Sequence, residues 1–339
     1  MENRNRTMDL IRSISVIFIL GLHISPMPFE NNAYALVTFQ SVLRLCNAFF
    51  FMLSGYFNIP KEFNEKRDYY KYYSRRFITV GFPVLLISLV SSIQSCINGT
   101  VEFTGIGHFL REYYILIITS AGGYWFILYL VGFLASVPIY SKAFKNMKFW
   151  ELKILLGISL VWMAFYVYFT KNIGLEFGYD GWALFGYATC FFLGYYCAVM
   201  PEEEKSWPYY LAGILAFGIT VYFCVNRYLH QFTHRYDYQP CFTIYALASF
   251  IFIMRRCKLK DGTFGKICSF VGKHSFTVFL LHGFFMSLVL KLTSGIANSA
   301  AFYFATLSLL FAASLAGAFL LDSLIIFPCE KLLKKLLRV

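Results

Sequence analysis

Residues 9–25 read DLIRSISVIFILGLHIS, an apolar run close to the length that a membrane-spanning helix needs. Two members do not fit a plain span, because Arg12 is a permanent cation and His23 carries a titratable ring. The eleven positions between them make almost three helical turns, so both side chains lie on one face, about 16 Å apart. Asp9 and Ser15 share that face. Such a stripe is expected to face a bundle interior or a wet cavity.

Simpler interpretations of these two residues remain open. Arg12 is near the inner end of the run and could reach the lipid headgroups with its long side chain. His23 is near the outer end and could be an interfacial ring. Under these simpler interpretations, Arg12 and His23 would lie on the same helix face only by coincidence, which favours the cavity interpretation.

The composition of the whole chain extends this interpretation to a polytopic membrane protein. Of 339 residues, 58% are hydrophobic and only 14% are charged, against about a quarter in soluble proteins. The apolar runs are too long for barrel strands, and helices satisfy their own backbone polar groups in lipid. We therefore expect one all-α domain over residues 1–339, with about ten transmembrane helices around a polar central cavity. The expected spans are 9–25, 36–57, 77–95, 124–141, 152–169, 181–199, 208–225, 240–255, 275–292 and 302–327.

The net charge of +12 is a topology signal and does not indicate nucleic acid. With the N-terminus inside, 23 of the 30 lysines and arginines fall on inner segments and five on outer ones. This asymmetry predicts that both termini are cytoplasmic. The apolar segment 106–120 is interrupted by glycine and charged residues, and we expect it to be interfacial or re-entrant.

The second expected span, LVTFQSVLRLCNAFFFMLSGYF at residues 36–57, carries an arginine near its middle. Arg44 at that depth costs about 2.5–3.5 kcal/mol on the insertion scale, so it is expected to have a function. Gln40 lies one turn before it and Asn47 three residues after, which makes a second polar face. Ser54, Gly55 and Tyr56 then allow close helix packing or a break.

The remaining polar residues carry weaker signals. His282 lies within an apolar segment and could be a core histidine bonded to a neighbouring carbonyl. His230 and His234 have the four-residue spacing of some metal ligands, but the segment lacks the glutamate of HExxH. The nine cysteines include no CxxC pair, so we expect neither a metal site nor a disulfide framework.

Several segments, in order along nearly the whole chain, resemble the acyltransferase 3 family of integral-membrane acyltransferases. The resemblance begins with the arginine and histidine of the first span and continues with the pattern FFxLSGY, met here at 49–57. The later segments are Arg75 and Arg76 ahead of Pro83, YWFILYLVGFL, FFLGYYCA, SFTVFLLH and FPCEKLLKK. One departure is Thr79, where the family often has a second arginine three residues after the first. The length of the chain, 339 residues, is similar to that of family members without an attached esterase-like domain.

The resemblance implies a donor, an acceptor and roles for particular residues. The donor would be cytoplasmic acetyl-CoA, with no permanently bound cofactor, and the acceptor a hydroxyl of a cell-surface or lipid-linked carbohydrate. Guanidinium groups bind phosphate in bidentate fashion, which suits Arg12, Arg75 and Arg76. His23 would be the base and Arg44 the oxyanion stabiliser. The other residues expected at the cavity are Asp9, Ser15, Gln40, Asn47, Ser54, Tyr56, Trp125 and His282.

Two rival classes fit the sequence less well. A secondary transporter or glycan exporter also needs intramembrane Arg and His, but such folds often show inverted repeats. We find no second copy of the Arg12–His23 segment or of the Ser-Gly-Tyr segment. A non-catalytic scaffold leaves Arg44 unexplained. The sequence therefore predicts a multi-pass O-acetyltransferase of a bacterial cell membrane.

Overall fold

The computed structural model describes residues 5–29, 31–97, 104–118, 125–165, 186–230, 239–260 and 262–339. These residues form helices and no strand, which confirms the all-α prediction. Two five-residue π-helical turns interrupt the α-helices, η1 (Phe77–Gly81) and η5 (Asp322–Ile326). The α-helices are α1 (Arg6–Leu22), α2 (Ala33–Leu43), α3 (Leu45–Asn58), α4 (Lys66–Arg76), α5 (Phe82–Ile97), α6 (Ile106–Ile118), α7 (Trp125–Phe144), α8 (Phe149–Ala164), α9 (Tyr187–Ala198), α10 (Trp207–His230), α11 (Pro240–Arg256), α12 (Thr263–Thr293), α13 (Ser299–Leu321) and α14 (Phe327–Leu336).

Several helix starts follow from local sequence. Asn5, Asn32 and Asn298 precede α1, α2 and α13, and each side-chain oxygen accepts a hydrogen bond from a backbone N–H three residues on. An asparagine in this position satisfies a donor that has no partner inside the helix. α11 begins at Pro240, where the missing N–H costs nothing.

Six helical stretches of the described chain are long and apolar enough to cross a membrane. The four remaining expected spans correspond to α1, α8, α9 and α11, which are shorter, with 17, 16, 12 and 17 residues. The count of ten spans therefore stays a prediction. Parts of the spans expected at 152–169 and 181–199 are seen as α8 and α9, and the ends between them lie outside the described residues. The described part of segment 106–120 is α6, with 13 residues, and its interfacial or re-entrant position stays a prediction.

The second expected span is one helical stretch of 26 residues with a tightened turn at Arg44. Arg44 ends α2 and precedes α3, and its carbonyl accepts from the Asn47 N–H, three residues on, at 3.3 Å. A three-residue hydrogen bond of this kind is the 3₁₀ geometry found at helix junctions. Arg44 thus lies at the point where the two halves of the stretch meet.

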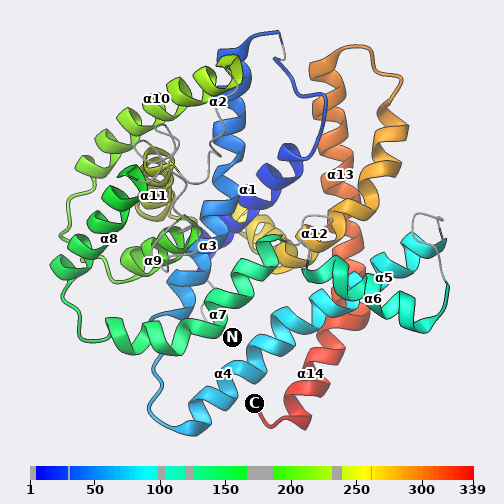
Figure 1. Cartoon of the computed structure of the whole chain (residues 1–339), viewed down its shortest axis with the longest axis horizontal. Coiled ribbons are helices and arrows are strands. Elements are labelled where there is room, and N and C mark those ends of the chain that lie inside the picture. Colours follow the sequence, from blue (N-terminus) through cyan, green and yellow to red (C-terminus); the bar gives the residue numbers. More distant parts are fainter. Residues whose placement is uncertain are drawn as a thin grey trace.

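Helices α1 and α3 run through the middle of the bundle (Figure 1). α3 packs mainly on α9, while α12 packs on both α1 and α13. Gly55 of α3 and Gly194 of α9 allow the first contact: a Cβ added at Gly55 would lie 1.8 Å from the Phe191 carbonyl oxygen, and one at Gly194 would lie 1.9 Å from that of Met52. The close packing expected from Gly55 is therefore found.

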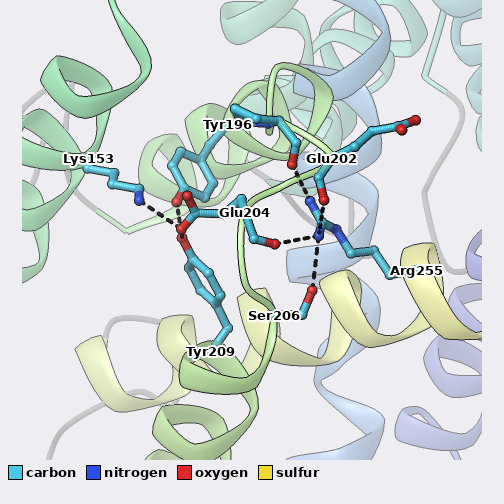
Figure 2. Close-up of polar contacts among 8 residues, drawn as sticks. Lys153, Tyr196, Glu202, Glu204, Ser206, Tyr209 and Arg255 are labelled. Atoms are coloured by element: carbon cyan, nitrogen blue, oxygen red, sulfur yellow. Dashed lines mark hydrogen bonds and ion pairs between the residues drawn. The ribbon is translucent and has the colours of Figure 1, made fainter.

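A polar cluster fastens the loop between α9 and α10 (Figure 2). The Arg255 guanidinium of α11 donates to the carbonyl oxygens of Pro201 and Glu204, both at 2.6 Å. The Glu204 carboxylate accepts from Lys153 at 2.7 Å and from the Tyr209 hydroxyl at 2.8 Å. The cluster joins α8, α10 and α11 and has no member in the cavities described next.

Candidate active site

A cavity of about 410 Å³ lies between α1, α3, the α4–η1 junction, α7 and α12, and we call it the cationic cavity. Among the described residues its lining includes three cations and no carboxylate. Its polar and charged lining residues are Arg12, Ser54, Asn58, Lys61, Arg76, Thr79 and Ser275, and its apolar lining includes Phe50, Phe126 and Phe279. The cavity is therefore suited to a ligand with an anionic end and an apolar or neutral end.

Arg12 is positioned by Asp9, one turn earlier on α1. Its Nη1 donates to Asp9 Oδ1 at 2.6 Å, and its guanidinium carbon lies 4.9 Å from the centroid of the Phe57 ring. Asp9 is fully buried and also accepts from the Ser269 hydroxyl of α12 at 3.1 Å. The Asp9 carboxylate thus fixes the Arg12 guanidinium at the wall of the cationic cavity, while Asp9 itself does not line the cavity. The polar stripe of α1 predicted that the two residues share a helix face, but not this positioning role.

Three residues from α3 and its following loop form a hydrogen-bonded row along the cavity. Asn58 Nδ2 donates to the Ser54 carbonyl at 2.8 Å, and Lys61 Nζ donates to Asn58 Oδ1 at 2.7 Å. The Ser141 hydroxyl of α7 donates to the Lys61 carbonyl. These contacts hold the Lys61 ammonium at the cavity before any ligand binds. Ser54 was expected here, whereas Asn58 and Lys61 were not.

The third cation of the cavity is Arg76, at the end of α4. Among the described residues, its buried Nε has no hydrogen-bond partner. Thr79 also lines the cavity, but its hydroxyl donates to the Arg75 carbonyl at 2.8 Å. The position where the family often has a second arginine therefore faces the cavity without supplying a charge.

A second cavity of about 350 Å³, the vestibule, adjoins the first. It is lined by Lys61, Glu62, Phe63, Asp68, Lys71, Tyr72, Arg75 and Arg76. Arg75, expected beside Arg76, thus lies in the vestibule and not in the cationic cavity. Burial, together with the charges of Arg76 and Arg75, lowers the pKa of Lys61 to about 7. Burial disfavours an ammonium, and neighbouring cations add to that effect.

His23 and His282 form a pair next to Phe279, which lines the cationic cavity. His23 is exposed at the C-terminal end of α1, and its ring centroid lies 5.1 Å from that of His282. His282 Nδ1 lies 2.5 Å from the Phe279 carbonyl oxygen, so that nitrogen carries the proton and Nε2 is free to accept one. Phe279 both lines the cavity and contacts the His282 ring at 5.9 Å between centroids.

Of the eight other residues expected at the cavity, Ser54 lines the cationic cavity and seven do not. Asp9 lies behind Arg12 and His282 pairs with His23, as described above, and the remaining five lie elsewhere. Ser15 is buried and its hydroxyl returns to the Ile11 carbonyl of its own helix at 2.7 Å. Gln40 contacts the Met27 sulfur, and Asn47 accepts from the Cys46 thiol. Tyr56 packs on the Phe57 and Phe250 rings. Trp125 packs on Tyr187 at 5.2 Å, leaving its neighbour Phe126 to line the cavity.

A buried polar pair outside both cavities joins α12 to η5. His274 Nδ1 lies 2.5 Å from Asp322 Oδ2, and the Thr277 hydroxyl donates to Asp322 Oδ1 at 2.6 Å. His274 and Asp322 are each 1% exposed. Asp322 therefore has these two side chains as its partners. His234, and the side chain of His230, lie outside the described residues.

The apolar helices and the polar residues held inside their bundle define an integral membrane protein. A family model described as an acyltransferase domain matches residues 5–323, nearly the whole chain. The chain therefore belongs to the acyltransferase 3 family, and it is a membrane acyltransferase. No curated protein and no solved structure matched it.

Proposed function

We propose that this acyltransferase takes its acyl group from acetyl-CoA bound in the cationic cavity. The observation that supports this best is the cavity lining, with Arg12, Lys61 and Arg76 and no carboxylate among the described residues. Lys61 and Arg76 form no ion pair with a carboxylate in the described part of the chain, and a polyanionic ligand would neutralise these partly buried charges. Coenzyme A is such a ligand, and guanidinium forks suit its phosphates.

The acyl end of the donor reaches His23 along α1 in this proposal. Arg12 and His23 are eleven residues apart, about 16 Å along the helix axis, so an extended arm must connect the phosphate end to the reacting end. Phe279 lies between the cavity and the histidine pair. The thioester would pass this ring to meet the acceptor beside His23.

The reaction is a transfer of acetyl from sulfur to oxygen. The acceptor hydroxyl attacks the thioester carbonyl, and His23 takes the hydroxyl proton as the new C–O bond forms. The C–S bond then breaks, and the coenzyme A thiolate leaves with that proton. Arg44 would stabilise the negative charge on the carbonyl oxygen, an effect that is strong where water is excluded. His282 would orient the His23 ring.

The acceptor is proposed from the family resemblance alone. It would be a hydroxyl of a cell-surface or lipid-linked carbohydrate, at a bacterial cell membrane. The charge split of the sequence supports a cytoplasmic location for both termini and for the donor entrance.

Mass spectrometry of surface glycans tests the function in the cell. A deletion strain of the source organism would be complemented with the native protein, with His23→Ala or with His108→Ala. His108 is a matched control because it pairs only loosely with Glu112, at 3.9 Å, and lines neither cavity. We expect glycan acetylation with the native protein and with His108→Ala, and none with His23→Ala. Acetylation by His23→Ala would exclude the proposed chemistry.

A further inference from the structure

The cationic cavity and the vestibule share two lining residues, Lys61 and Arg76. Both cations also lie over one aromatic ring: Lys61 Nζ is 5.3 Å from the Tyr72 ring centroid, and the Arg76 guanidinium carbon is 5.6 Å from it. In the described part of the chain, neither forms an ion pair with a carboxylate. The junction between the cavities is therefore flanked by two cations without carboxylate partners.

The carboxylates of the vestibule are already engaged by other groups. Glu62 Oε1 lies 3.3 Å from Lys145 Nζ. Asp68 Oδ2 accepts the backbone N–H groups of Asn64 and Glu65, each at 2.9 Å, at the start of α4. Neither acid is paired with Lys61 or Arg76, so the cations at the junction stay available to an anionic ligand.

We propose that Lys61 is a donor-binding residue that holds, together with Arg76, the diphosphate of a coenzyme A thioester at this junction. The inference rests on the proposed function. The pantetheine arm then lies in the cationic cavity, and the nucleoside with its 3′-phosphate lies in the vestibule beside Arg75. A lysine supplies a point charge and an arginine a two-pronged fork, and both suit phosphate oxygens. Lys61 thereby supplies the charge that Thr79 does not.

Two ligands separate the phosphate contacts: coenzyme A, and 3′-dephospho-coenzyme A, which retains the diphosphate alone. Equilibrium binding of each would be measured on the purified full-length protein in detergent, with native, Lys61→Met, Arg75→Met and Lys142→Met chains. Lys142 is a matched control because, like Lys61, it is a lysine over an aromatic ring, with its Nζ 5.3 Å from the Tyr69 ring centroid. Unlike Lys61, it lines neither cavity.

We expect Lys61→Met to weaken both ligands by the same factor, about tenfold or more, as loss of a charged hydrogen bond does. Arg75→Met should weaken coenzyme A alone, and Lys142→Met should leave both affinities unchanged. If Lys61→Met does not fold, as judged by its elution and melting, Lys61→Gln keeps an amide donor for Asn58 and should show the same loss.

Two results would overturn the inference. Native affinity of the Lys61 variants for both ligands would remove Lys61 from the site, and a loss confined to coenzyme A would assign it to the 3′-phosphate. A native protein that binds neither ligand would instead refute the proposed function itself. The two failures are thus distinguishable in one set of titrations.

Discussion

The contact between α3 and α9 predicts a large effect for Gly55→Ala. The added Cβ would lie 1.8 Å from the Phe191 carbonyl oxygen and 2.8 Å from its carbon, whereas ordinary contacts begin at 3.4 Å. The helices would have to move apart by about 1.6 Å, because the obstacle is backbone and cannot turn away. Overpacking of this kind costs about 1–3 kcal/mol, and a backbone obstacle favours the upper end.

Thermal unfolding in detergent, followed by intrinsic fluorescence, measures the effect of Gly55→Ala. At about 2–4 °C per kcal/mol for a medium-sized domain, a loss of 2–3 kcal/mol lowers the melting temperature by at least about 4 °C. Gly132→Ala and Gly157→Ala are matched controls, since each is a helical glycine with no atom within 4 Å of the added Cβ. They should be neutral or slightly stabilising. A Gly55→Ala protein that melts within 1 °C of the native one would refute the packing of α3 on α9.

Three further predictions concern charged residues. The Lys61 ammonium loses its proton as pH rises through its pKa of about 7, so affinity for 3′-dephospho-coenzyme A should fall between pH 7 and 9 in titrations. Lys61→Arg should remove this dependence, and an unchanged slope would contradict the role of the lysine. Asp322→Ala leaves the buried His274 and Thr277 without their acceptor, so it should destabilise by about 3–5 kcal/mol in melting experiments. Breaking the exposed pair of Glu62 with Lys145 by Glu62→Ala should lower the melting temperature far less, and equal effects would contradict the burial argument. Arg44→Ala should lower kcat more than it raises the KM for acceptor, since its charge acts on the transition state, and near-native turnover would exclude Arg44 from the mechanism.

The sequence predicted much of α1 correctly because helical periodicity alone brings Arg12 and Asp9 to one face. It could not tell where that face meets a cavity. Arg12 lines the cationic cavity, but the Ser15 hydroxyl bonds to its own helix backbone, and His23 pairs with His282 outside the cavity lining. Serine has this local alternative because its short side chain reaches the carbonyl one turn back.

Lys61 was missed because a lysine in a short loop is usually a topology signal. Its spacing from Ser54 and Asn58 is seven and three residues, which is the spacing of one helix face continued past the helix end. Helical periodicity could therefore have suggested the hydrogen-bonded row of Ser54, Asn58 and Lys61. The vestibule could not be predicted, since it depends on how the loop after α3 packs on α4 through Phe63, a contact between segments that the sequence pattern does not specify.

The number of spans shows a different limit. Apolar run length predicts a span at 181–199, and its described part, α9, has 12 residues of which all but Ala198 are buried, with α3 as the main neighbour. A buried helix and a spanning helix both need apolar residues, so composition does not distinguish them.

Equilibrium binding of acetyl-CoA to the purified protein tests the central claim most directly. We expect the native protein to bind and Arg76→Met to bind at least about tenfold more weakly, because the variant removes a partly buried cation from both the cationic cavity and the vestibule. Lys142→Met, which removes a cation outside both cavities, should bind as the native protein does. An Arg76→Met protein that is folded and retains native affinity for acetyl-CoA would contradict the account.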